Sequence, residues 1–231
     1  MTEPPPHPAK YSDTIMSRLA SVIAHEAYIT KDHKLKVLDP FAGTGRIHTL
    51  LDDPNIETWG VEIEKEWAFM HRNTVLGDAH DLPWGVGHFD VVATSPCYGN
   101  RMADHHEAKD DSKRMTYRHQ LGRALSENSA GKIPWGPRYW EFHELAWDEV
   151  TRVLKPGGLF VLNVKNFLRT RTIKGKRVQE TVDVAQWHLD AIVTRGYQVE
   201  ADDQVPVRSM GFGQNGNKRI SHERVISFRR V

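Results

Sequence analysis

Apolar and polar positions along most of the chain follow two periods, one typical of strands and one of helices. Strand-like segments are expected at 37–38, 58–63, 74–76, 89–93, 159–164, 197–199 and 223–230. Between them, apolar residues recur every three or four positions, as in helices, at 15–23, 66–72, 139–154 and 182–194. Because strands that alternate with helices usually pair in parallel, the pattern predicts an α/β fold with a doubly wound, mostly parallel seven-stranded sheet.

Residues 99–137 interrupt this pattern. They show no clear period and are rich in charged residues, histidine, glycine and asparagine. An irregular connection of this length within a compact domain is usually a lid, a binding insertion or a disordered segment. We therefore expect a single domain that carries an insertion at 99–137.

A turn with two glycines follows the strand expected at 37–38. Residues 39–46 have the sequence DPFAGTGR, and apolar positions at 47, 50 and 51 then predict a helix. Glycine lets the backbone approach a ligand closely, and the free N–H groups at the start of a helix face that ligand. The turn is a candidate binding site, although two spaced glycines also occur in ordinary strand-to-helix connections.

Acidic residues end the next two expected strands. Glu62 ends the second strand, where a carboxylate can accept both hydroxyls of a ribose. Asp78 follows the third strand and can accept a hydrogen bond from an adenine amino group. Together with Asp39, these carboxylates come from strand ends that meet at one edge of a doubly wound sheet. The arrangement predicts a site for a nucleoside-type cofactor.

The strand expected at 89–93 is followed by the sequence TSPCY at 94–98. Together with 39–46, this segment resembles the cofactor loop and the catalytic loop of the S-adenosylmethionine-dependent amino-methyltransferases, which methylate exocyclic amines of DNA bases. The resemblance extends from His7 through the last strand, and it is specific only at 39–45 and 95–98. It implies a Rossmann-like methyltransferase fold over one domain, 1–231, in which the insertion acts as a lid or contacts DNA.

The resemblance also implies which residues bind S-adenosyl-L-methionine. The segment 7–12, HPAKYS, is similar to the stretch that contacts the methionine end of the cofactor in this family. The implied cofactor-binding residues are Lys10, Asp39, Pro40, Phe41, Gly43, Gly45, Glu62, Asp78, Ala79 and Ser95.

The catalytic residues implied by the resemblance are Ser95, Pro96 and Tyr98. An exocyclic amine is a poor nucleophile because its lone pair is delocalised into the base, and acceptors for both N–H groups would make the nitrogen tetrahedral. The Ser95 hydroxyl and the Pro96 carbonyl can be those acceptors, and Tyr98 can stack on a flipped base. A serine in the first position is more similar to the cytosine-N4 enzymes than to the adenine-N6 enzymes, which favours cytosine.

Cys97 departs from the family pattern, which has a second proline at this position. A Pro-Cys pair also resembles the cytosine 5-carbon methyltransferases, whose thiolate is a covalent nucleophile. Their Glu-Asn-Val partner is absent from the chain. Three alternatives stay open: that reaction at Cys97, transfer to RNA guanine or a protein glutamine, and a cofactor-binding module that does not catalyse.

Basic residues are concentrated locally, although 31 Lys and Arg nearly balance 30 Asp and Glu over the whole chain. Six of them, and no acid, lie between 165 and 177, directly after the strand expected at 159–164. Such a run is usually a solvated loop, but beside a base-sized pocket it favours contacts with the phosphates of double-stranded DNA. The residues expected to bind DNA are Arg101, Arg169, Arg171, Lys174, Lys176, Arg177, Lys218 and Arg219, the last two in an amide-rich loop at 208–219.

The remaining composition excludes several classes of protein. A single cysteine excludes an internal disulfide, and the adjacent histidines at 105–106 cannot easily converge on one ion, so no metal is expected. No segment approaches membrane-spanning length, so we expect a soluble cytoplasmic protein without a membrane partner. Whether it is a monomer or a homodimer stays open.

Overall fold

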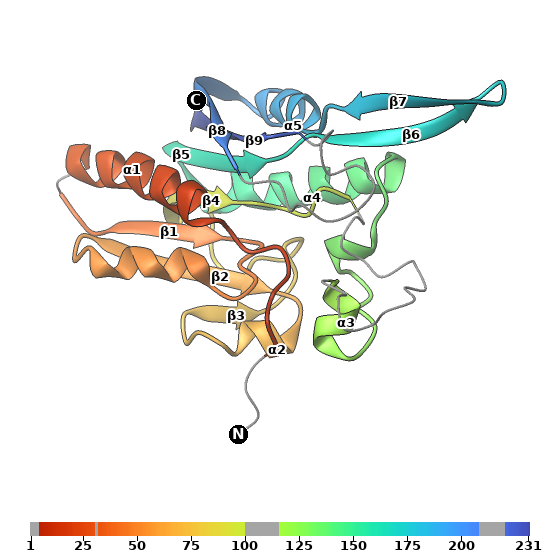
Figure 1. Cartoon of the computed structure of the whole chain (residues 1–231). Helices are drawn as coiled ribbons and strands as arrows, with labels where there is room; N and C mark the ends of the chain where they lie inside the picture. Colours follow the sequence, from red (N-terminus) through yellow and green to blue (C-terminus); the bar gives the residue numbers. More distant parts are fainter. Residues whose placement is uncertain (1–4, 31, 100–115, 208–219) are drawn as a thin grey trace.

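A seven-stranded sheet forms the centre of the molecule (Figure 1), seen here in a computed structural model that describes residues 5–30, 32–99, 116–207 and 220–231. The strand order is β3-β2-β1-β4-β5-β9-β8, and every pair is parallel except those that β9 makes with its two neighbours. The prediction of a doubly wound, mostly parallel sheet is confirmed. The strands are β1 (Leu35–Asp39), β2 (Ile56–Glu62), β3 (Thr74–Leu76), β4 (Phe89–Thr94), β5 (Leu154–Val164), β8 (Tyr197–Pro206) and β9 (His222–Arg230).

Helices cover both faces of this sheet (Figure 1). One face packs against α1 (Asp13–Ile29) and the short 3-10 helix η1 (Arg46–Asp52), and the other packs against α4 (Pro137–Val153) and α5 (Val184–Val193). Alternate residues of β4 therefore enter different cores: Val91 and Ala93 pack towards α1, whereas Val92 packs towards α4. Burial on both faces explains why residues 91–93 of this strand are all apolar and do not alternate with polar residues.

Local sequence determines how the elements around the glycine turn begin. Ser12 caps α1, because its hydroxyl accepts a hydrogen bond from the Ile15 backbone N–H at 3.2 Å. After the turn, the expected helix forms only as 3-10 helix η1, which starts behind Gly45 at a φ of +75°. The helix expected at 66–72 is also shorter, and α2 spans Lys65–Ala68.

Pro156, Gly157 and Gly158 follow α4 but do not form a separate connection between this helix and the next strand. Strand β5 already starts at Leu154, which lies opposite Phe89, and the register shifts before Val91. The residues 155–158, expected as a connection, are therefore a distorted entrance to β5.

The basic segment at 165–177 is a hairpin and not the expected loop. Strands β6 (Phe167–Ile173) and β7 (Lys176–Val182) pair antiparallel and form a separate two-stranded sheet. Lys174 and Gly175 connect them with φ values of +49° and +75°, as a two-residue hairpin turn requires. The hairpin extends away from the main sheet (Figure 1).

The described part of the insertion contains two short helices, α3 (Tyr117–Leu121) and η3 (Ala130–Lys132). Thr116 caps α3 through a hydrogen bond from the His119 backbone N–H. Residues 100–115 and the loop 208–219 lie outside the described residues, and Arg101, Lys218 and Arg219 lie there with them.

Candidate functional site

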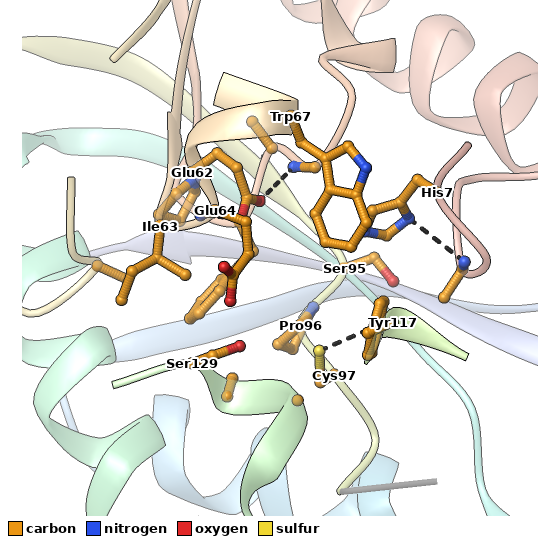
Figure 2. Close-up of a pocket in the computed structure, with 18 of the residues that line it drawn as sticks. His7, Glu62, Ile63, Glu64, Trp67, Ser95, Pro96, Cys97, Tyr117 and Ser129 are labelled. Carbon is orange, nitrogen blue, oxygen red and sulfur yellow. Dashed lines mark hydrogen bonds between the residues drawn. The ribbon is translucent and has the colours of Figure 1, made fainter. Parts of the chain in front are cut away.

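A pocket of about 140 Å³ opens at the carboxyl ends of β1 to β4 (Figure 2). Its wall is built from the N-terminal segment, the glycine turn, the ends of β2 and β3, the turn after β4 and the described part of the insertion. The predicted site residues in this wall are Lys10, Pro40, Phe41, Gly43, Glu62, Asp78, Ala79, Ser95, Pro96 and Tyr98. Segments far apart in the sequence therefore meet at the expected edge of the sheet.

Asp39 and Gly45, both predicted to bind the cofactor, are not part of the pocket wall. Asp39 is fully buried, and its carboxylate accepts hydrogen bonds from the Phe41 N–H at 3.0 Å, the Thr94 hydroxyl at 2.7 Å and the Tyr11 hydroxyl at 3.1 Å. Burial raises the pKa of Asp39 to about 6, and these hydrogen bonds oppose the rise. Asp39 thus joins the glycine turn, β4 and the N-terminal segment.

Glycine is required at position 43 because the N-terminal segment passes directly over the turn. Gly43 has a φ of +54°, and a Cβ atom there would lie 3.3 Å from the His7 imidazole. His7 packs edge-on against Trp67, with ring centroids 4.3 Å apart, and burial lowers its pKa to about 4. The neutral imidazole and the indole lie together at one side of the pocket (Figure 2).

Glu62 connects two turns and still faces the pocket. One carboxylate oxygen accepts a hydrogen bond from the Gly43 N–H at 2.8 Å, and the other accepts from the Glu64 N–H at 2.9 Å. A carboxylate oxygen has two lone pairs, so each retains one for a ligand. Desolvation raises the pKa of Glu62 to about 7 despite these two hydrogen bonds. The geometry suits a ligand that presents two neighbouring hydroxyls.

Asp78, at the end of β3, is the next acidic residue of the pocket wall. Its carboxylate accepts hydrogen bonds from the His80 N–H at 3.0 Å and the Asn128 side-chain amide at 3.0 Å. Asn128 belongs to the insertion, for which the sequence pattern predicts no regular element. The insertion therefore contributes directly to this end of the pocket.

A set of contacts that we call the insertion latch holds the described part of the insertion, 116–137, against β2. Glu64 is buried, and its carboxylate accepts hydrogen bonds from the Ser126 N–H and the Ser126 hydroxyl, each at 2.9 Å. The Arg123 guanidinium lies 2.8 Å from the same carboxylate. Tyr117 and Leu125 pack on Trp67 nearby. The described part of the insertion thus lines the pocket, and its role as a lid or binding region stays a prediction.

The candidate catalytic turn, residues 95–98, is held by hydrogen bonds to strands β5 and β9. The Ser95 hydroxyl lies 2.9 Å from the Tyr98 hydroxyl, and it accepts from the Asn163 amide at 3.2 Å. The same amide donates to Glu223 at 2.8 Å, and the Tyr98 hydroxyl donates to Glu223 at 3.5 Å. Since Glu223 accepts from Tyr98, Ser95 donates to Tyr98 and keeps a lone pair as an acceptor.

Asn163 and Glu223 were missed by sequence reasoning. The available signal was a single amide side chain within the otherwise apolar segment 159–164. Buried polar groups need partners, and this one is 1% exposed and adjacent to the turn.

The Pro96 carbonyl receives no hydrogen bond from any group in the described part of the chain. It could therefore serve as a second acceptor beside Ser95, and its role in catalysis stays a prediction. The next carbonyl, that of Cys97, is already engaged, because it accepts from the Tyr139 hydroxyl at 2.9 Å.

The hydrogen bond to the Cys97 carbonyl continues into the helical layer. His188 lies 2.9 Å from the Tyr139 hydroxyl, and its other ring nitrogen accepts from the Trp147 indole N–H at 3.1 Å. Because indole only donates, His188 is the neutral tautomer that donates to Tyr139. Burial lowers the pKa of His188 well below its usual value, which keeps this arrangement uncharged.

The environment of Cys97 disfavours a thiolate. Its sulfur lies 3.5 Å from the Tyr117 hydroxyl, and burial raises the pKa of the thiol to about 11. A nucleophilic cysteine needs the opposite shift.

The basic residues of the hairpin differ in their partners. Arg169 and Arg171 both form ion pairs with Glu180, at 2.6 Å and 2.9 Å, an acid that lies just beyond the predicted basic run. Lys174, Lys176 and Arg177 are exposed, and among the described residues they have no acidic partner. Within the same part of the chain, no three metal-ligating side chains are grouped, and no helix is long and apolar enough to cross a membrane.

Comparison with solved structures identifies the fold. An S-adenosylmethionine-dependent methyltransferase of Methanosarcina mazei is 13% identical with a TM-score of 0.54, over 90% of this chain and 97% of that chain. A protein of Pyrococcus horikoshii is 18% identical with a TM-score of 0.53, over 95% and 92% of the two chains. A cyclase named SpnF is 15% identical with a TM-score of 0.56, over 97% and 85%.

These likenesses confirm the Rossmann-like fold of S-adenosylmethionine-dependent methyltransferases. The presence of a cyclase among them illustrates that this fold does not determine the reaction. No protein-family model matches the sequence, and no curated protein matches it. Reaction and substrate must therefore be argued from the site.

Proposed function

We propose that this protein transfers the methyl group of S-adenosylmethionine to an exocyclic amine of a base in double-stranded DNA. The observation that carries the proposal is the position of the Ser95 and Pro96 acceptors in the same pocket wall as Glu62 and Asp78. One part of that pocket suits a nucleoside and the other suits an amine. The methyl donor must meet the amine where these parts join.

The residues present fit this cofactor. Glu62 offers two acceptor oxygens for a ribose diol, and Asp78 offers an acceptor for an adenine amine. Gly43 leaves room where a Cβ atom would approach His7, and Lys10 lies in the same wall near the expected methionine end. When bound, the sulfonium of the cofactor supplies an activated methyl group.

The chain's own groups prepare the nucleophile. Ser95 Oγ and the Pro96 carbonyl accept the two N–H groups of the amine, so that its lone pair leaves the plane of the base. With the cofactor held by Glu62 and Asp78, its sulfonium would supply the methyl group to this nitrogen, leaving S-adenosylhomocysteine, and the amine proton would pass to water. Positioning and local electrostatics supply the acceleration, since the methyl group is already activated.

Tyr98 receives the base in this proposal. Its hydroxyl is fixed by Ser95 and Glu223, and the residue is part of the pocket wall. Stacking on an aromatic ring contributes about 1–3 kcal/mol per base, which offsets the few kcal/mol that flipping costs. The serine at position 95 favours cytosine N4 over adenine N6 as the acceptor.

The alternative reaction at Cys97 is less well supported, because desolvation raises the pKa of this partly buried thiol to about 11, and such a thiol is a poor nucleophile at neutral pH. Methyl transfer to RNA guanine or to a protein glutamine uses the same acceptors, and it differs from the proposal in the macromolecule that brings the amine. A non-catalytic cofactor-binding module would need none of the contacts around Ser95.

Labelled S-adenosylmethionine and unmodified duplex DNA test the proposal. We expect label in DNA and, after digestion, N4-methylcytosine identified by mass. Tyr98→Ala should lose transfer while cofactor affinity is retained, whereas Tyr28→Ala, an exposed tyrosine of α1, serves as the matched control. Label in RNA or protein but not in DNA would contradict the proposed substrate. Cofactor binding without any transfer would favour the non-catalytic module.

A further inference from the structure

The hairpin β6–β7 begins three residues after β5 ends, at the edge of the sheet that carries the candidate site. Its base is anchored, because Phe167 and Val182 are buried together with Val184 and pack against Trp135. Beyond this anchor the strands project from the body of the molecule (Figure 1). Each strand has seven residues, which corresponds to a length of about 23 Å.

Charge on the hairpin points to a polyanion. Residues 165–182 contain six basic residues and one acid, a formal charge of +5, whereas the whole chain carries +1. The rest of the protein is therefore net acidic, and attraction to phosphate is concentrated on this ribbon.

The register divides the exposed side chains between two faces. Residues directly opposite in an antiparallel pair share a face, and Thr170 lies opposite Gln179 while Thr172 lies opposite Arg177. We call this set of four the polar face. The other face carries the ion pairs of Arg169 and Arg171 with Glu180, and also the exposed Ile173 and Val178.

The polar face has hydrogen-bonding groups without partners. Among the described residues, none forms a side-chain hydrogen bond with Thr170, Thr172, Arg177 or Gln179, and all four are exposed. These are the side-chain types that read base edges: glutamine pairs with adenine, arginine pairs with guanine, and threonine pairs with either.

We propose that the hairpin enters the major groove of duplex DNA with its polar face towards the base edges and so determines the sequence that is methylated. This inference rests on the proposed function. A two-stranded ribbon fits the major groove of B-form DNA, which is about 12 Å wide, but not the deep, narrow major groove of double-stranded RNA. The Arg169–Glu180–Arg171 ion pairs stiffen the opposite face, and Lys174 and Lys176 at the tip contact phosphates.

The test measures sequence preference of the full-length enzyme. Duplex DNA with randomised positions is methylated by the wild type, Gln179→Ala, Arg177→Ala and the control Ile173→Thr, and the methylated sequences are read. We expect the two polar-face variants each to lose preference at one base pair by about 10- to 100-fold. Ile173→Thr, on the opposite face of the same hairpin, should keep the wild-type preference.

A second measurement separates phosphate contact from base reading. Lys174→Gln should reduce the slope of log affinity against log salt by about 0.9 and leave sequence preference unchanged. Unchanged preference in both polar-face variants, with wild-type DNA methylation intact, would overturn the hairpin inference and leave the proposed function standing. If only Ile173→Thr changed the sequence preference, the other face would contact the bases, and this result would also overturn the hairpin inference. A wild type that neither binds nor methylates DNA would overturn the inference and the proposed substrate together.

Discussion

Replacing Glu62 by glutamine tests the cofactor site most directly, because this carboxylate has two structural hydrogen bonds and two free lone pairs. Both backbone donors, at Gly43 and Glu64, need an acceptor, and a glutamine amide offers only one oxygen. Whichever way the side chain is turned, its NH₂ group therefore faces one of these two backbone N–H groups. We expect the loss of about one charge-assisted hydrogen bond, about 1.5–3 kcal/mol, or about 10- to 150-fold in cofactor affinity.

The raised pKa of Glu62 also predicts how cofactor affinity changes with pH. The ionised carboxylate accepts both hydroxyls, so the affinity of the wild type should fall as pH decreases through about 7, where Glu62 takes up its proton. The folding stability of the ligand-free protein changes with pH in the opposite direction. A raised pKa means that the folded state binds this proton more tightly than the unfolded state does. That contribution to stability is lost as pH rises from 4.5 towards 7.

Isothermal titration with S-adenosylhomocysteine between pH 5.5 and 8.5 measures the loss of affinity in Glu62→Gln and the pH dependence of affinity in the wild type. The matched control is Glu57→Gln, on the same strand but outside the pocket wall, and it should behave like the wild type. If Glu62→Gln binds as tightly as the wild type with the same pH profile, Glu62 does not contact the ribose.

Three further predictions concern the candidate catalytic turn, the insertion latch and the glycine turn. Asn163→Ala should reduce turnover about tenfold through the lost hydrogen bond to the candidate catalytic turn; an equal loss of cofactor affinity would indicate a structural role instead. Ser126→Ala removes one contact of the insertion latch, so limited proteolysis should cut 116–137 faster; an unchanged rate would mean that the latch does not hold this segment. Gly43→Ala should lower the free energy of unfolding by about 1–2 kcal/mol and weaken cofactor binding, because it adds crowding against His7 to a left-handed φ. Gly175→Ala, with similar φ and open space around it, should lower stability alone, and a parallel loss of cofactor affinity there would refute crowding as the cause.

The centre of the sheet could be predicted because β4 and most of β5 are buried on both faces. All six residues of β4 are buried, and the apolar run at 91–93 indicates the strand without an alternating period. The turns at 39–46 and 95–98 follow such strands directly, which placed them at one edge of the sheet. The main error near the site was the helix after Gly45, where a short 3-10 helix forms instead.

The hairpin could not be found in the same way, since beyond its anchored base both faces are exposed and both carry polar or charged side chains. Without a buried face there is no contrast between apolar and polar positions for a strand period to show. A weaker signal was present: Lys174-Gly175, with a glycine suited to positive φ, lies between segments rich in threonine and valine. The run of basic residues indicated a function for the segment but did not predict that it forms two strands.

The insertion shows a different limit. Its described half folds by contact with distant residues, above all Glu64 and Trp67, and not by an internal period. Asn128 reaches Asp78 only because of that packing. A contact between residues fifty positions apart leaves no periodic pattern in the local sequence, so residue spacing cannot predict it.

The chain of hydrogen bonds from Trp147 through His188 and Tyr139 to the Cys97 carbonyl has a consequence for heat inactivation. It makes the reacting loop part of the same cooperative unit as helices α4 and α5, because the loop cannot shift without exposing buried polar groups on both. Catalysis should therefore fail at the temperature at which those helices melt, and not in an earlier, local transition.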